Sequence, residues 1–259
     1  MTSITVAKFG GSALGAEGVM IPKIIERIKQ MQKESKVVAV FSAPLIEYEG
    51  KLSSMTDVAI KVGKNYAASI PVEIEVLREV YERIAAEHLK DEKKEFLDQL
   101  DKFYRQVIIS LKGAAENRRF VDVIRSRTLA YSGEVTMCYL MGYVMRAHGI
   151  KAAHVPIEDW PIITDDNFEA ANFMPNESRE ASAKLVELIE GNDVVSMGGF
   201  IGRTADNLET TYERGGSDRT AADIAIILND KYETRISFEK DSAVLSADPK
   251  IVKDGLDFV

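Results

Sequence analysis

One stretch near the carboxyl end of the chain concentrates groups that bind anions. It runs from Glu209 to Asp223 and reads ETTYERGGSDRTAAD. A guanidinium can clamp an anion through two hydrogen bonds, and glycines let the backbone approach a ligand closely. The apolar residues that follow predict a helix, whose first N–H groups would face the same ligand. The stretch therefore predicts a phosphate site, although a turn followed by a helix cap explains it equally well in isolation. Its candidate groups are Thr210, Thr211, Arg214, Gly215, Gly216 and the predicted N-cap pair Ser217 and Asp218.

A second candidate phosphate turn lies at the amino end of the chain. Residues Ile4 to Phe9 read as a β-strand that runs directly into a pair of glycines. Apolar residues follow at helical spacing from Ile21 onward, so the segment reads strand, glycine turn, helix. Open α/β sheets bind ligands at the carboxyl ends of their strands, and Lys8 would lie there. The candidate contacts of this turn are Lys8, Gly10, Gly11 and Ser12.

Ser42 and Thr56 are two further candidate contacts. The apolar run from Lys36 to Ala43 is typical of a strand inside a parallel sheet, and Ser42 would emerge at its end. Residues 44–55 are polar and predict irregular structure. Thr56 and Asp57 then open a short helix, so Thr56 is either a ligand contact or a helix cap.

The composition favours a small charged metabolite as the ligand. The chain has 259 residues, 46% of them hydrophobic, and a formal net charge of −8, which argues against nucleic acid or an anionic membrane as the main partner. We find no apolar run long enough to span a bilayer and no leader at the amino end, so the cytoplasm is the expected location. Cys138 cannot form an intrachain disulfide and reads as a buried apolar residue, while His88, His148 and His154 lack ligand spacing. No metal site is predicted.

The middle of the chain predicts helices. Two long amphipathic helices span Ile74 to about Leu111, with a break at Lys90 to Lys94, and predict a hairpin packed beside the sheet. Another helix is expected from Arg118 to Ala130. Glu134 then opens a helix that continues through Met145, where its charge favours the helix dipole whether or not it has another role.

The second half alternates between short apolar runs and helices. Strands are expected at 152–157, 160–164, 193–197 and 234–238, with a last one near Val244, and a helix at 180–190 that ends with Gly191 as its C′ residue. The run at 193–197 enters a second glycine turn at 198–202. Alternating strands and helices predict a mainly parallel sheet between helical layers. Without repeats or long linkers, we expect one domain over residues 1–259, with a helical insertion at about 71–117.

Seven motifs, in this order along the chain, together resemble aspartate kinases of the amino acid kinase family. They are KFGGS at 8–12, SA at 42–43, SGE at 132–134, TDDNF at 164–168, GFIG at 199–202, RGGSD at 214–218 and ADPK at 247–250. The resemblance covers nearly the whole chain. It implies a three-layer αβα sandwich that binds ATP and L-aspartate across the carboxyl ends of the strands. It also implies transfer of a phosphoryl group to give ADP and 4-phospho-L-aspartate, at the entry to lysine, threonine and methionine synthesis.

The residues suit this chemistry. A carboxylate with a pKa of about 3.9 is ionised at neutral pH, so the attacking group needs no general base, and catalysis reduces to positioning and charge stabilisation. Lys8 would neutralise charge on the transferred group, with Asp218 orienting it, while the glycine amides approach the phosphates. Magnesium would bridge the phosphates, held mostly by phosphate oxygens and water. By resemblance, Arg214 takes the α-carboxylate and Glu134 the α-amino group of the substrate, and Ser42, Thr56, Phe200 and Ser217 complete that pocket. A homodimer is also expected.

The chain departs from the resemblance at its carboxyl end. Where the family usually reads Thr-Asp-Val-Asp-Gly near the adenosine, residues 239–243 read EKDSA, so an acid has become Lys240. We expect the adenosine between Phe238 and Lys250, with Lys240 or Lys250 reaching a phosphate. The family usually continues into more catalytic domain and paired regulatory ACT domains, so feedback inhibition through such domains is not expected. Two alternatives stay open: a kinase of the same fold for another small carboxylate, and a non-catalytic nucleotide-binding regulatory subunit.

Overall fold

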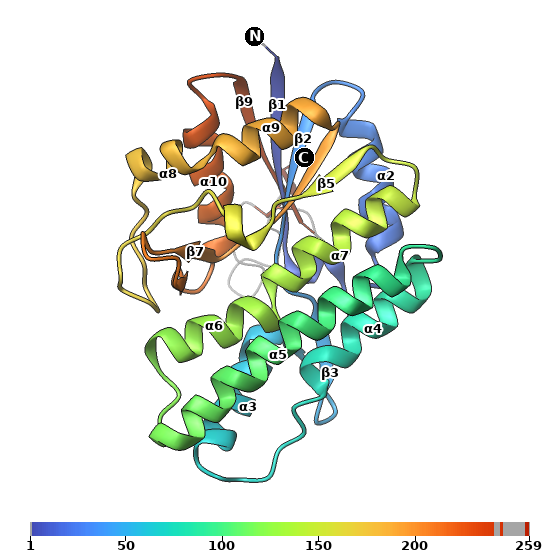
Figure 1. Cartoon of the computed structure of the whole chain (residues 1–259). Helices are drawn as coiled ribbons and strands as arrows, with labels where there is room; N and C mark the ends of the chain where they lie inside the picture. The colour runs from blue at the N-terminus through green and yellow to red at the C-terminus, as the bar shows by residue number, and fades with distance from the viewer. Residues whose placement is uncertain (1, 241–243, 246–256, 259) are drawn as a thin grey trace.

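Five parallel strands form the central sheet of the computed structural model, which describes residues 2–240, 244–245 and 257–258 (Figure 1). Their order across the sheet is β5 (Ala152–His154), β6 (Val194–Gly198), β2 (Lys36–Phe41), β1 (Ser3–Phe9) and β9 (Glu233–Glu239). Each neighbouring pair is parallel. β1, β2 and β6 are nearly all buried, as a sheet covered on both faces requires. The predicted mainly parallel α/β sheet is confirmed.

Helices cover both faces of this sheet. α2 (Ile21–Met31) and α7 (Glu134–Ala147) lie on one side in Figure 1, with α8 (Pro175–Ala181) and α10 (Gly216–Leu228) on the other. α9 (Ala183–Gly191) packs against β2 and β6. α10 packs against β1, β2 and β9, which brings its first turn to the carboxyl end of the strand that carries Lys8.

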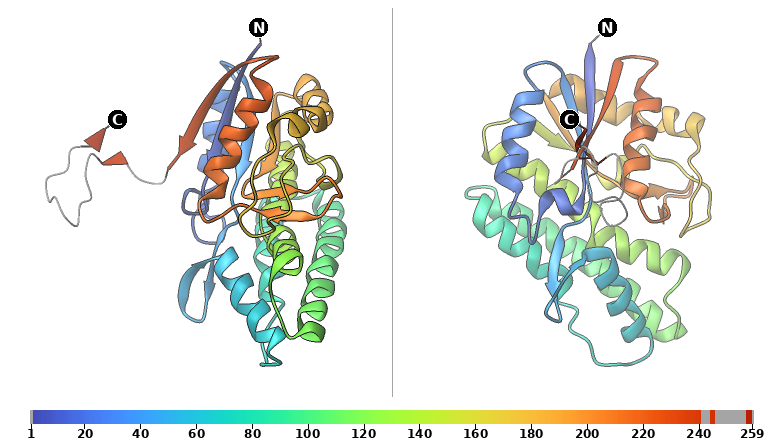
Figure 2. Two further views of the ribbon diagram at one scale, coloured as in Figure 1. Left: turned by 90° about the vertical axis from the view of Figure 1, so that its left-hand side faces the viewer. Right: turned by 180° about the vertical axis from the view of Figure 1, so that it is seen from behind.

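A helical hairpin forms as predicted, from α4 (Val76–His88) and α5 (Lys93–Asn117), which pack against each other. It packs mainly against other helices, so its predicted position beside the sheet is wrong. With α3 (Met55–Ala67) and α6 (Asp122–Ser132), α4 and α5 build a helical layer beyond the carboxyl ends of the strands, in the lower half of Figure 1. α7 packs against both this layer and the sheet, and so links the two. The views in Figure 2 place this layer below the sheet from the side and from behind. The layer supplies the roof of the cavity described below.

Residues 44–55 form a β-hairpin, so the predicted irregular segment is wrong. β3 (Leu45–Tyr48) pairs antiparallel with β4 (Lys51–Ser54). The two residues between them, Glu49 and Gly50, both have positive φ, at 50° and 71°. This is the backbone of a two-residue hairpin turn, whose twist matches that of the paired strands. In the sequence, only Gly50 indicated that a tight turn could join two strands here.

Three expectations for the second half also need correction. Residues 160–164, which follow the short 3-10 helix η1 (Ile157–Asp159), form only isolated bridges, from Ile163 to Arg203 and from Thr164 to Phe173. The N–H of Ile163 donates to the Ser178 hydroxyl instead of to a neighbouring strand, which interrupts the pairing. The helix expected at 180–190 is two helices, α8 and α9. Gly191 is the last residue of α9 and has no left-handed φ. The Lys36 ammonium instead binds the carbonyls of residues 189, 190 and 192 at 2.6–3.2 Å.

The remaining elements are short. α1 (Gly11–Leu14) follows the first glycine turn, and β7 (Ile201–Arg203) pairs with β8 (Glu209–Thr211) just before α10. β10 (Val244–Leu245) pairs with β11 (Asp257–Phe258), so a strand does form near Val244. Within the described ranges, no helix combines the length and apolar character needed to cross a membrane.

Replacing Gly63 by alanine should destabilise the protein, although the same change inside a helix ordinarily stabilises it by up to about 1 kcal/mol. A Cβ at Gly63 would lie 2.2 Å from the ring of Phe120. Overpacking of this kind costs about 1–3 kcal/mol, so thermal unfolding should shift downward.

Gly113→Ala is the matched control, because a Cβ there would meet its nearest neighbour at 3.7 Å. This variant should be neutral or stabilised. If Gly63→Ala were as stable as Gly113→Ala, the close packing of α3 against the Phe120 ring would be contradicted.

Candidate active site

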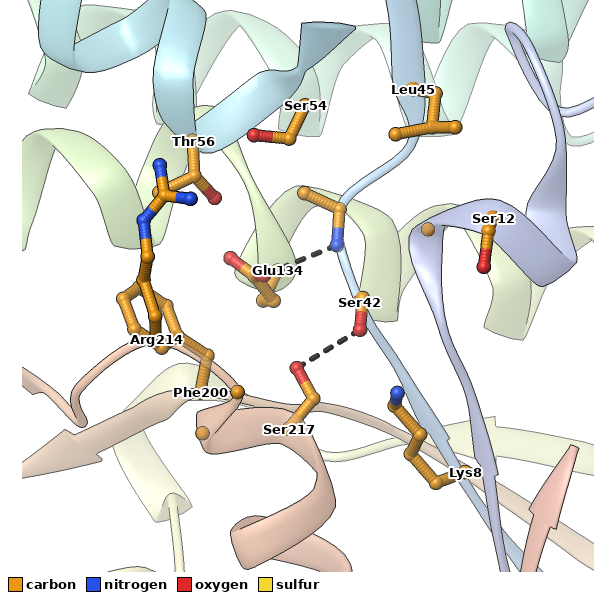
Figure 3. Close-up of a pocket in the computed structure, with 14 residues that line it drawn as sticks. Lys8, Ser12, Ser42, Leu45, Ser54, Thr56, Glu134, Phe200, Arg214 and Ser217 are labelled. Atoms are coloured by element: carbon orange, nitrogen blue, oxygen red, sulfur yellow. Dashed lines mark hydrogen bonds between the residues drawn. The ribbon is translucent and has the colours of Figure 1, made fainter. Parts of the chain in front are cut away.

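A cavity of about 300 Å³ opens at the carboxyl ends of β1 and β2, between the sheet and the helical layer (Figure 3). It brings together most of the residues predicted from the sequence. The predicted residues that line it are Lys8, Gly11, Ser12, Ser42, Thr56, Glu134, Phe200, Arg214, Gly215, Gly216 and Ser217. Ala43, Leu45 and Ser54 complete the lining without having been predicted.

Lys8 lines the floor of the cavity and forms an ion pair with Asp218, which does not itself line it, with 2.7 Å between Nζ and Oδ1. Lys8 is 9% exposed, whereas the Asp218 side chain is 44% exposed. Partial burial raises the pKa of Asp218, but the ammonium groups of Lys8 and Lys240 outweigh burial and hold that pKa below its usual range. A Cβ at Gly10 would lie 3.0 Å from the Lys8 ammonium, so the glycine leaves room for this group.

The first turn of α10 differs from the sequence-based prediction. Gly215, with φ at 86°, is the N-cap residue, so Ser217 and Asp218 lie inside the helix rather than capping it. A left-handed φ is available to glycine at little cost, which explains why the helix begins two residues early. Asp218 therefore does not cap the helix, and its carboxylate pairs with Lys8. An acidic residue in the first turn is also favoured by the helix dipole.

Glu134 is a buried carboxyl group that faces the cavity. It is 4% exposed, and its Oε1 accepts the backbone N–H of Ala43 at 3.2 Å. Oε2 has no hydrogen-bond partner among the described residues. Burial raises the pKa of Glu134 to about 7, and the N–H of Ala43 offsets only part of that effect. A buried, half-satisfied carboxyl group is suited to receive a cationic ligand group.

The helical hairpin supports the turn that carries Glu134. The fully buried hydroxyl of Tyr81, on α4, donates to the carbonyl oxygens of Ser132 and Gly133 at 2.7 and 3.1 Å. Gly133 also packs closely, since a Cβ there would lie 2.8 Å from the carbonyl oxygen of Leu129. These contacts fix the start of α7 and hence the position of Glu134.

Arg214 lies at the mouth of the cavity, where its side chain is 83% exposed. Its Nη2 pairs with Oδ1 of Asp57, in the first turn of α3. Ser54 caps that helix by accepting the N–H of Asp57 at 3.1 Å, so the cap is Ser54 and not Thr56. Thr56 is consequently free of a capping role and lines the cavity.

Ser42 and Ser217 join the two sides of the cavity floor. Their hydroxyl groups lie 2.9 Å apart, with Ser42 donating (Figure 3). A Cβ at Gly199 would lie 2.5 Å from the Cβ of Ser217, so the second glycine turn allows this close packing. The predicted glycine turn at 198–202 therefore allows α10 to pack closely against the end of β6.

The residues predicted to hold the nucleotide are less concentrated. Lys240 lies with Nζ 3.6 Å from Oδ2 of Asp218, the carboxylate whose Oδ1 pairs with Lys8. Glu239 pairs with Arg27 of α2 through two contacts of 3.0 and 3.2 Å. Phe238 is 47% exposed on β9. Neither Phe238 nor Lys240 is among the residues that line the cavity. Lys250 and residues 241–243 lie outside the described residues.

Sequence reasoning missed the residues that act through contacts distant in the chain. Tyr81 looked like one apolar position of an amphipathic helix, and Asp57 like a helix-start residue. Ala43 acts through its backbone, which a motif does not reveal. Only Ser54 had a local signal, a serine three residues before an aspartate.

Comparisons with known proteins agree with this architecture. The family model described as amino acid kinase family matches residues 3–258. Aspartokinase 3 of Bacillus subtilis is 28% identical over 253 residues, an alignment that covers 96% of this chain and 51% of that protein. An aspartokinase of Rickettsia felis is 33% identical over 122 residues, covering 47% of this chain and 29% of that protein. This chain thus spans about half the length of aspartokinase 3, the relative that it matches almost from end to end.

Solved structures extend the agreement to the fold. The crystal structure of E. coli aspartokinase III in complex with aspartate and ADP has a TM-score of 0.76 at 19% identity, covering 98% of this chain and 53% of that one. Aspartate kinase of Clostridium acetobutylicum has a TM-score of 0.60 at 22% identity, covering 98% and 52%. At these identities the likeness concerns the fold alone. Because the family model matches almost from end to end, this chain belongs to the amino acid kinase family.

Proposed function

We propose that this chain transfers the terminal phosphoryl group of ATP to the side-chain carboxylate of L-aspartate, giving ADP and 4-phospho-L-aspartate. The observation that carries the proposal is the content of one cavity: the Lys8 ammonium on its floor, the buried Glu134 carboxyl group, and the Arg214 guanidinium at its mouth. These charges complement a transferred phosphoryl group, an ammonium and a carboxylate, respectively. The names of the relatives, all aspartokinases, support the same substrate.

The phosphate half of the cavity would stabilise charge. Lys8 neutralises the charge that develops on the transferred group, and Asp218 holds the Lys8 ammonium in place. The phosphates are also bound by backbone N–H groups, those of the first turn of α10 and of the Gly10–Ser12 turn. Lys240, which shares Asp218 with Lys8, contacts the polyphosphate from the side of β9, and Phe238 lies towards the adenosine. Magnesium would be supplied with ATP and held mainly by phosphate oxygens and water.

The amino-acid half would fix the orientation of aspartate. Glu134 accepts the substrate ammonium, and Arg214 holds the α-carboxylate by charge-assisted hydrogen bonds. The side-chain carboxylate then points towards Lys8 and needs no general base, because it is already ionised. Ser42, Thr56 and Ser217 offer hydroxyls to the bound substrate, and Phe200 forms an apolar wall.

The affinity for aspartate should rise with pH through neutrality. Burial raises the pKa of Glu134 to about 7, so below that pH its carboxyl group is neutral and cannot offset the substrate ammonium. Between pH 6 and pH 8 the ionised fraction increases about tenfold, and KM for aspartate should fall by a similar factor. The measurement is KM for aspartate against pH at saturating Mg-ATP.

The Glu134→Gln variant is the control for this profile. Its KM should be high and should lose the pH dependence near 7, because the amide does not ionise. If the wild-type KM showed the same pH dependence as the variant, a group other than Glu134 would bind the substrate ammonium.

Purified protein incubated with Mg-ATP and L-aspartate tests the proposed function, with hydroxylamine trapping of the acyl phosphate and measurement of ADP. Aspartate-dependent hydroxamate supports it. A panel of other small carboxylates tests the related-kinase alternative, since product from one of those alone would replace aspartate as the substrate. ATP binding without any product would favour a regulatory subunit. A homodimer and a cytoplasmic location stay predictions, and light scattering would test the first.

A further inference from the structure

Phe200 has an unusual backbone for a bulky residue. Its φ of 66° lies in the left-handed region, which aromatic residues rarely adopt. It connects β6 to β7 and lines the cavity. Such conformations cost free energy and persist only where the surroundings enforce them. The contacts around Phe200 therefore identify what holds it.

Thr220, on the second turn of α10, supplies one of these contacts. Its side chain is completely buried, and its Oγ1 accepts the N–H of Phe200 at 2.9 Å. The same hydroxyl donates to the carbonyl oxygen of Gly216 at 3.0 Å. The N–H of Tyr212 donates to the carbonyl oxygen of Phe200 at 2.9 Å, so both backbone polar groups of Phe200 are bound.

The ring of Phe200 lies on the first turn of α10. A Cβ at Gly216 would lie 3.0 Å from Cδ2 of Phe200. Gly216, Ser217 and Phe200 all line the cavity. Thr220, which does not line it, thus ties the aromatic wall of the cavity to the helical turn that forms its floor.

We infer that Thr220 is a positioning residue that sets the shape of the amino-acid half of the cavity by holding Phe200 in its left-handed conformation. This inference rests on the proposed function, because it assigns that half to aspartate. Without the hydroxyl, the N–H of Phe200 loses its acceptor, and one of the contacts that offset the strain at that residue is removed. The segment relaxes, and the aromatic wall moves relative to Ser217.

Two substitutions separate the hydroxyl from the shape of the side chain. Thr220→Val keeps the volume and removes the hydroxyl, so KM for aspartate should rise about 5- to 20-fold, with kcat within about twofold. Thr220→Ser keeps the hydroxyl, so KM should stay within about twofold of wild type. KM for ATP should change in neither variant. Amide hydrogen exchange of the peptide containing Phe200 should accelerate in Thr220→Val alone.

A double-mutant cycle tests whether Thr220 acts through Phe200. If it does, Thr220→Val added to Phe200→Ala should cause no further rise in KM. An additive effect, or equal KM and equal exchange in wild type, Thr220→Val and Thr220→Ser, would overturn the inference. A wild-type protein that never forms product from aspartate would instead refute the proposed function, so the two failures are distinguishable.

Discussion

The Lys8→Ala variant should lose about 100- to 1000-fold in kcat while its affinity for Mg-ATP changes only a few-fold. The ammonium lies on the floor of the cavity, 9% exposed and 2.7 Å from Asp218. Its contact with the phosphoryl group strengthens as charge develops during transfer, so its removal affects the transition state more than the bound substrate. Steady-state production of ADP, together with calorimetric binding of ATP, measures both effects.

Lys23→Ala is the matched control for Lys8→Ala, because Lys23 is exposed on α2 and lines no part of the cavity. It should retain wild-type kinetics. Unchanged turnover in Lys8→Ala would refute the role of Lys8. Equal losses in ATP binding and in kcat/KM would make Lys8 a simple binding group rather than one that favours the transition state.

The Arg214→Ala variant should raise KM for aspartate roughly 10- to 100-fold, the cost of losing charge-assisted hydrogen bonds to a carboxylate. The exposed guanidinium contacts Asp57 through Nη2, which leaves its other N–H groups available to a substrate. Because the α-carboxylate takes no part in bond making, kcat should fall much less than kcat/KM. Initial rates against aspartate concentration at saturating ATP give both parameters.

Arg235→Ala removes an exposed guanidinium from β9, outside the cavity, and should leave both parameters unchanged. If Arg214→Ala altered only the KM for ATP, the guanidinium would belong to the nucleotide and the assignment of the two halves of the cavity would be wrong. Arg214→Lys should have a KM for aspartate nearly as high as that of Arg214→Ala, because the compact ammonium lacks the planar, bidentate hydrogen-bonding geometry of the guanidinium.

The sequence predicts the catalytic end of the sheet well, because the signals there are local. Lys8 is the next-to-last residue of the β1 run, just before two glycines, and the Arg214–Ser217 segment leads into an apolar helix, so both ends of the cavity can be inferred from short windows. The resemblance to aspartate kinases then assigns Glu134 to the same pocket. Lys8, Glu134 and the Arg214–Ser217 segment all line the cavity in the structure.

The rest depends on contacts between distant residues or on exact backbone angles. Tyr81 meets the carbonyls of residues 132 and 133 across 51 and 52 positions of sequence, and Arg214 meets Asp57 across 157. The predicted cap at Ser217 and Asp218 was wrong because a positive φ at Gly215 begins the helix earlier. The positive φ of Phe200 has no residue-type signal at all, since aromatic residues avoid that region.

The order of strands in the sheet has a consequence for how the protein is made. β1, the strand that carries Lys8, is flanked by β2 on one side and by β9 on the other. Residues 3–9 therefore cannot acquire their second neighbour until residues 233–239 have left the ribosome. Contacts between such distant segments form slowly, because the entropy cost of closing a long loop comes before the contacts can stabilise the fold. Until then, β1 presents an unpaired strand edge, and until residue 218 has been made Lys8 also lacks Asp218 as its counter-ion.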